Sequence, residues 1–151
     1  MIGIVLVAHG NLAQSLLDVV ELISGPQKAF RALAISAADN IETKRSDLMD
    51  VIDAVDEGNG VIVLTDLFGG TPSNLAISVL GLKHIEVMAG VNVQMILKLL
   101  SVHAKDDLQT CVTKIVSEGQ KHIRVASEFL RANEALNMSS QQETKNAVKG
   151  I

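Results

Sequence analysis

The sequence predicts an α/β fold, in which helices alternate with the strands of a doubly wound, mainly parallel sheet of four strands. Short runs of β-branched and aliphatic residues recur along the chain, and the first of them is Ile2–Val7. A continuous apolar run of this kind is typical of a strand that is buried on both faces. Each run is followed by a segment whose apolar residues recur at helical spacing, and this alternation is the pattern of βαβ units.

The first half of the chain contains two complete strand–helix pairs. The helix after the first strand is expected over Leu12–Ile23, where apolar residues share one face, and Gly25-Pro26 ends it. Phe30–Ile35 alternates loosely between apolar and polar residues and is predicted to be the second strand. Asn40 is a suitable N-cap for the second helix, expected over Ile41–Val55.

The second half repeats the pattern around a Gly-rich segment. A turn at residues 58–60 introduces the third strand, Gly60–Thr65. Pro72 suits the first turn of a third helix that runs on through Asn74–Gly81, with Thr71 as its N-cap. The remaining predicted elements are a fourth strand at Ile85–Ala89 and helices at Val93–Val102 and Asp107–Gly119.

The end of the chain differs from the rest. His122–Ala126 is expected to be a short fifth strand, and its polar residues favour a place at the edge of the sheet. An edge strand near the C-terminus suits pairing with a second subunit. Residues 127–151 are polar with little apolar periodicity, so we expect one domain over 1–126 and a flexible or loosely helical tail.

The composition excludes several classes of protein. Hydrophobic residues make up 48% of the 151 residues and aromatic residues only 2%, so the core must be aliphatic. The net charge of −4 and the scarcity of aromatic side chains argue against nucleic-acid binding. The single cysteine, Cys111, excludes an internal disulfide and a multi-cysteine zinc site, and we expect it to be buried.

No segment has the character of a signal peptide or a membrane span. The apolar N-terminus lacks preceding basic residues, and the long uncharged stretch Leu67–Leu82 is interrupted by glycine, proline and polar residues. We therefore expect a cytoplasmic protein that is not embedded in a membrane.

Polar residues follow the first and third predicted strands. His9 comes at the end of the first strand and Asp66 directly after the third. Ligands of open parallel sheets bind beyond the carboxyl ends of the strands, so His9 and Asp66 lie side by side if these strands are neighbours. The carboxylate then accepts a hydrogen bond from one ring nitrogen, and the other nitrogen presents its lone pair outward. No third ligand accompanies them, so no metal is expected.

The turn Gly69-Gly70-Thr71 adds a second feature at the same edge. It offers backbone N–H groups, a hydroxyl and the positive end of a helix dipole, which suit a phosphate-sized anion. Taken singly, a histidine at a strand end, an aspartate in a turn and a Gly-rich turn each have an ordinary structural explanation. Their occurrence at one sheet edge favours a phosphohistidine site. His84, His103 and His122 are expected at the surface, without convergent groups around them.

Three segments resemble one known family, and they occur in the same order and with similar spacing. These segments are Ile4–Gly10, Asp66–Asn74 and Ala89–Asn92. Together they resemble the enzyme IIA component of the mannose-type (mannose, fructose, sorbose) phosphoenolpyruvate-dependent phosphotransferase system. The resemblance covers about residues 1–126.

The resemblance implies a function, partners and roles for individual residues. His9 would accept a phosphoryl group on Nε2 from the phosphocarrier protein HPr and pass it to a IIB protein for sugar uptake, without a cofactor. Asp66 would orient His9, while Thr71, Gly70 and Gly69 would bind the phosphate. Leu67, Phe68 and Asn92 would belong to the surface that docks partner proteins. The family also implies a homodimer that exchanges its C-terminal strand.

Other functions remain open at this point. Many members of the family continue into a IIB domain, for which this chain has no room, so the acceptor is expected to be a separate protein. A standalone IIA domain is also suited to a regulatory role, in which phosphorylation of His9 controls binding to a target. A phosphoryl-carrier subunit of a dihydroxyacetone kinase is a further alternative, although that branch lacks the Gly-Gly-Ser/Thr-Pro turn. A hydrolase or nucleotide-binding protein is disfavoured, because the loop has no lysine.

Overall fold

The computed structural model describes residues 1–149, with the side chains of residues 1–136 and of Met138. Its centre is one parallel sheet of four strands in the order β2-β1-β3-β4. The predicted fold class and the four parallel strands are therefore confirmed. The strands are β1 (Gly3–His9), β2 (Phe30–Ile35), β3 (Val61–Thr65) and β4 (Ile85–Ala89).

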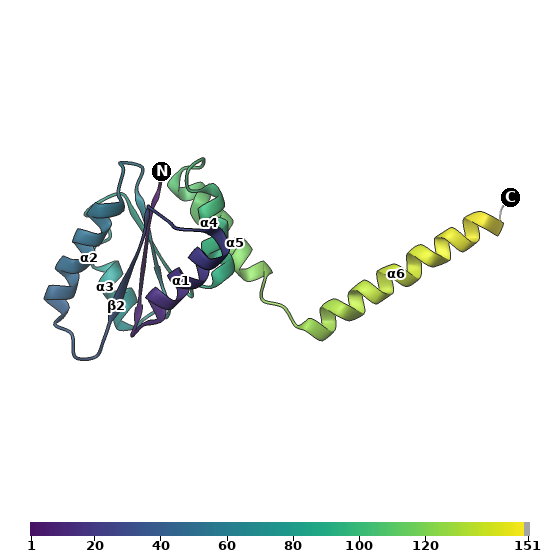
Figure 1. Cartoon of the computed structure of the whole chain (residues 1–151), viewed down its shortest axis with the longest axis horizontal. Helices are drawn as coiled ribbons and strands as arrows, with labels where there is room; N and C mark the ends of the chain where they lie inside the picture. Colours follow the sequence, from purple (N-terminus) through teal and green to yellow (C-terminus); the bar gives the residue numbers. More distant parts are fainter. Residues whose placement is uncertain (150–151) are drawn as a thin grey trace. The chain divides into compact units, whose positions relative to one another are not determined.

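Helices cover both faces of the sheet (Figure 1). Helices α1 (Leu12–Ser24), α4 (Val93–Val102) and α5 (Leu108–Lys121) pack on one face, and α2 (Ile41–Val55) and α3 (Thr71–Ile77) pack on the other. Successive residues of β1 alternate between these layers, since Leu6 belongs to the first apolar cluster and Val7 to the second. Cys111 is fully buried in the first cluster, as predicted.

Most predicted elements agree with the structure to within about two residues, but the third helix does not. Gly70, and not Thr71, is the N-cap of α3, and Thr71 is its first residue. The helix ends at Ile77, before the predicted end at Gly81. The backbone N–H groups of Ser78, Val79 and Leu80 donate to the carbonyls three residues earlier, which tightens the chain into turns after α3.

The predicted fifth strand is absent from the part of the chain that the structure describes. Residues 122–125 are irregular, and helix α6 (Ala126–Lys149) begins where the strand was expected to end. A strand exists only by pairing with another backbone, and the described chain offers this segment no such partner. Residues 126–149 contain no glycine or proline, which is consistent with the helical form of the two expected for this tail.

The chain divides into two compact units, Met1–Gln120 and Lys121–Ile151. The first unit holds the whole sheet and both apolar clusters. This division falls a few residues before the boundary predicted at Ala126. Within the described residues, no helix has both the length and the apolar character that a membrane crossing requires.

Candidate functional site

His9 and Asp66 meet at the carboxyl ends of two neighbouring strands. Strands β1 and β3 pair directly, with Val7 of β1 opposite Thr65 of β3. His9 is the last residue of β1, and Asp66 follows the last residue of β3. The register therefore brings the two residues together, and the juxtaposition expected from the sequence is confirmed.

Asp66 binds both the backbone and the ring of His9 through one carboxylate oxygen. The distance from Nδ1 of His9 to Oδ2 of Asp66 is 2.8 Å, and the backbone N–H of His9 donates to the same oxygen at 3.0 Å. The backbone N–H of Leu67 donates to Oδ1 at 2.9 Å. An ionised carboxylate is only an acceptor, so Nδ1 carries the proton and Nε2 presents a lone pair. Nε2 makes no hydrogen bond to any described residue.

Exposure differs between the two side chains of this pair. The side chain of Asp66 is 14% exposed, whereas that of His9 is 48% exposed. Partial burial raises the pKa of Asp66, but the hydrogen bonds from His9 and Leu67 outweigh this effect and hold the pKa of that carboxyl below its ordinary value. Asp66 is therefore ionised at neutral pH, and about half of the His9 side chain is exposed to solvent.

The Gly-rich turn lies against the open edge of the imidazole. A Cβ on Gly70 would lie 2.9 Å from Cε1 of His9 and 3.5 Å from Nε2, so this approach requires glycine. Gly69 has a φ of +83°, which also favours glycine. The sequence suggested that the N–H groups of these two glycines are free to bind an anion, but both are engaged. That of Gly69 donates to Oγ of Ser73 at 2.9 Å, and that of Gly70 donates to the carbonyl of Leu67 at 3.3 Å.

Thr71 differs from the two glycines of this turn, because its hydrogen-bond donors are not engaged by other described residues. It is exposed, and neither its backbone N–H nor its hydroxyl donates to another described residue. Of the three residues predicted to bind phosphate, Thr71 therefore has uncommitted donors, while Gly69 and Gly70 shape the turn.

The three residues predicted to dock partners differ in their surroundings. Leu67 and Phe68 are 60% and 78% exposed, beside Asp66 in the chain. Asn92 is partly buried, and its side chain is the N-cap of α4, accepting from the N–H of Met95 at 3.0 Å. Its amide also donates to the carbonyl of Gly119 at 3.4 Å. The structure thus gives Asn92 a role within the fold, and its role in docking stays a prediction.

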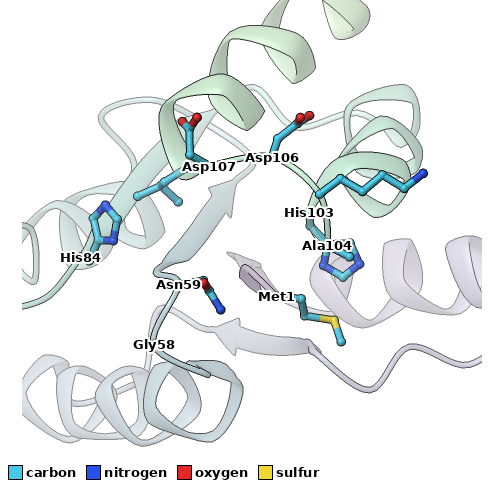
Figure 2. Close-up of a pocket in the computed structure, with 10 residues that line it drawn as sticks. Met1, Gly58, Asn59, His84, His103, Ala104, Asp106 and Asp107 are labelled. Carbon is cyan, nitrogen blue, oxygen red and sulfur yellow. The ribbon is translucent and has the colours of Figure 1, made fainter.

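Two of the other histidines line a cavity of about 470 Å³ at the opposite end of the sheet (Figure 2). His84 precedes β4, and His103 follows α4. The expectation that nothing converges around these histidines was wrong in this respect. Nδ1 of His103 lies 3.0 Å from the carbonyl of Ile2, so the ring ties α4 to the start of the chain. Among the described residues, no three side chains of His, Cys, Asp or Glu are grouped to hold a metal ion.

Ser73 is not among the site residues predicted from the sequence. Its hydroxyl accepts from Gly69 and donates to the carbonyl of Gly70 at 3.0 Å, and the side chain is fully buried. A serine one residue after a proline at a helix start gives a weak signal, because many such hydroxyls are exposed.

Comparisons with known proteins identify relatives of this chain. A profile of the family described as "PTS system fructose IIA component" matches residues 3–116. The chain is 25% identical over 144 residues to the "PTS system fructose-specific EIIA component" of Bacillus subtilis, which covers 95% of this chain and 99% of that protein. It is 35% identical over 107 residues to the "PTS system mannose-specific EIIAB component" of Escherichia coli K12, covering 70% of this chain and 32% of that protein. This chain thus spans about a third of that relative.

A solved structure with the same fold is the phosphotransferase system component EIIA from Streptococcus agalactiae. It matches with a TM-score of 0.76 and 30% sequence identity, over 85% of this chain and 99% of that one.

Proposed function

The chain belongs to the family of phosphotransferase-system fructose IIA components, and we propose that His9 is the residue on which it carries the phosphoryl group. Members of this family, which includes mannose and sorbose types, are phosphotransferase-system proteins that transfer phosphoryl groups. The observation that carries the proposal is the 2.8 Å contact from Nδ1 of His9 to Asp66, which leaves Nε2 without a hydrogen-bond partner among the described residues, beside Gly70. We propose phosphorylated HPr as the donor and a IIB protein of a sugar uptake system as the acceptor.

In the proposed reaction, Nε2 of His9 attacks the phosphorus in line with the leaving atom of the donor. The Nε2 lone pair forms the new bond, while the bond from phosphorus to the donor breaks and its electron pair stays on the donor atom. The ring gains positive charge as this bond forms, and the ionised Asp66 beside Nδ1–H stabilises that charge. The hydroxyl and N–H of Thr71 then meet oxygens of the phosphoryl group.

Leu67 and Phe68 are proposed to form the docking surface for donor and acceptor proteins. Both are large, apolar and exposed, and they directly follow the residue that orients His9. An apolar contact beside the reacting nitrogen excludes water while two proteins exchange the phosphoryl group. Because the same surface serves both partners in turn, each complex must be short-lived.

A homodimer with exchanged C-terminal strands remains a proposal for this chain. Strand β4 is an edge of the sheet and, among the described residues, pairs only with β3, so its other side is available to a strand from a second copy. Residues 122–125, where the strand was predicted, are irregular in the single chain. Sedimentation equilibrium of the full chain and of a variant with Pro at Val125 tests this: exchange predicts a dimer that the Val125→Pro variant loses.

The central experiment is phosphorylation of the purified protein. Incubation with enzyme I, HPr and phosphoenolpyruvate, followed by mass spectrometry, should show one acid-labile phosphate on the peptide that contains His9. Omission of HPr should remove the signal. A stoichiometric phosphate on another residue, or none under conditions that label a known IIA protein, would contradict the proposal.

A further inference from the structure

We propose that Ser73 is a positioning residue for His9: its buried hydroxyl holds the Gly69–Gly70 turn against the imidazole so that Nε2 keeps the orientation needed for phosphoryl transfer. This inference rests on the proposed function of His9. Among the described residues, the buried polar side chains are Thr65 and Ser73. Burial of a hydroxyl is unfavourable unless its hydrogen bonds are satisfied, so its two partners indicate what Ser73 does.

Ser73 connects α3 to the turn that precedes it by two hydrogen bonds. Its Oγ accepts from the backbone N–H of Gly69 at 2.9 Å and donates to the carbonyl of Gly70 at 3.0 Å. The side chain of Asn74 adds a weaker bond to the carbonyl of Gly69 at 3.2 Å. The positions of both glycines are therefore fixed by a side chain that reaches neither solvent nor a partner protein.

The Gly69–Gly70 turn limits the movement of the His9 imidazole. Gly70 lies so close that a Cβ there would be 2.9 Å from Cε1 of His9, and Asp66 holds Nδ1 at 2.8 Å. The imidazole thus lies between a carboxylate on one side and the Gly70 backbone on the other. If the turn moves away, the ring gains freedom to rotate, and the fraction of time in which Nε2 is in line for transfer falls.

Ser78 provides a matched control, because it separates this role from ordinary helix stabilisation. Its hydroxyl donates to the carbonyl of Leu75 at 2.7 Å, three residues earlier, as that of Ser73 does to Gly70. It lies at the other end of α3, away from the Gly69–Gly70 turn. If the loss of a local hydrogen bond were enough to slow phosphorylation, both Ser73→Ala and Ser78→Ala would be slow. If the effect depends on the position of His9, only Ser73→Ala should be slow.

The experiment compares Ser73→Ala, Ser73→Cys and Ser78→Ala in the full chain. The rate of phosphorylation by HPr, kept phosphorylated by enzyme I and phosphoenolpyruvate, is measured as a function of HPr concentration. Two lost hydrogen bonds should lower the rate at saturating HPr about tenfold in Ser73→Ala, with KM unchanged, because Ser73 does not contact the donor. Ser73→Cys fills the same space with a poor hydrogen-bonding group and should lose rate in the same direction. Ser78→Ala should keep the wild-type rate.

Nuclear magnetic resonance gives a readout that is independent of transfer. In Ser73→Ala, the ¹⁵N resonances of the His9 ring and of the Gly69 amide should shift or broaden, while Ser78→Ala leaves them in place. A wild-type rate in Ser73→Ala, an equal loss in Ser78→Ala, or unchanged ring resonances overturns the inference. Failure of the wild-type protein to accept phosphate would instead refute the proposed function, and the ring resonances would still decide whether Ser73 positions His9.

Discussion

The two ends of the parallel sheet both carry a partly exposed histidine, yet they use it differently. At the carboxyl end, Nδ1 of His9 contacts a carboxylate, and Nε2 lies beside a glycine turn. At the amino end, Nδ1 of His103 contacts the backbone carbonyl of Ile2, and the backbone N–H of Ile2 donates to the carbonyl of His103. A neutral carbonyl anchors a ring and stabilises positive charge on it only weakly, whereas an ionised carboxylate anchors the ring and stabilises that charge much more strongly.

This difference predicts the chemistry at each end. Phosphorylation places positive charge on an imidazole, so the ring with the ionised partner is suited to it. His103 lines a cavity of about 470 Å³, but its ring fastens the start of the chain to the end of α4. In this protein, the hydrogen-bond partner of each histidine therefore distinguishes the residue suited to phosphoryl transfer from the structural one better than its exposure does.

The largest expected effect comes from removing each histidine. His9→Ala should abolish phosphorylation and lower the free energy of unfolding by no more than about 1 kcal/mol, because the side chain is half exposed and the backbone N–H of residue 9 still donates to Asp66. His103→Ala should be phosphorylated at the wild-type rate, but the lost hydrogen bond to Ile2 should lower the free energy of unfolding by about 1–2 kcal/mol. Labelling and urea denaturation of both variants measure this. Loss of labelling in His103→Ala would remove the distinction between the two ends.

The next largest effect tests the carboxylate itself. Both oxygens of Asp66 accept N–H groups, Oδ2 from His9 and Oδ1 from Leu67. The amide in Asp66→Asn has a single oxygen, so an NH₂ group must face one of these donors or impose the opposite tautomer on the ring. We expect the rate of phosphorylation to fall about 100-fold, because the partner of Nδ1 fixes the tautomer and the orientation of the ring.

Asp107→Asn is a suitable control for this substitution. Asp107 also binds a backbone N–H, that of Thr110, but it lies at the cavity end of the sheet. It should transfer phosphate at the wild-type rate. A wild-type rate in Asp66→Asn as well would show that His9 needs no ionised partner.

A smaller effect is expected at the proposed docking surface. Phe68→Ala should raise the KM for phosphorylated HPr about tenfold, because truncation of an exposed aromatic anchor typically costs an interface 1 kcal/mol or more. Leu22→Ala, on α1, is the control, since Leu22 is also a large, apolar and highly exposed side chain. Steady-state phosphorylation kinetics separate KM from the limiting rate. Equal effects of the two substitutions would place the docking surface elsewhere.

The part of this site that was predictable depends on backbone register. Apolar runs located β1 and β3, and their pairing then required His9 and Asp66 to be neighbours, so residue type and topology sufficed. The hydrogen bonds of Ser73 depend on side-chain orientation in a short helix whose N-cap proved to be Gly70, which no periodicity reveals. The segment 122–125 failed as a predicted strand for another reason: its apolar residues suit a strand, but pairing requires a backbone that local sequence does not supply.

The smallest effect concerns stability in acid, and its sign follows from the hydrogen bonds of Asp66. These bonds lower the pKa of Asp66 in the folded chain, so the unfolded chain binds its proton more readily. The stabilisation is complete above the ordinary aspartate pKa of 3.8 and is lost as the pH falls through the lower folded value. Asp66→Asn should therefore be less stable than the wild type by about 1–2 kcal/mol at pH 7, and the difference should shrink as the pH falls below 4. Urea denaturation across this pH range measures the difference in free energy of unfolding between each variant and the wild type. His103→Ala is the control, because its loss of stability does not depend on a carboxylate. A loss of stability in Asp66→Asn that stays constant down to pH 2 would show that the ionised carboxylate does not stabilise the His9 end of the sheet.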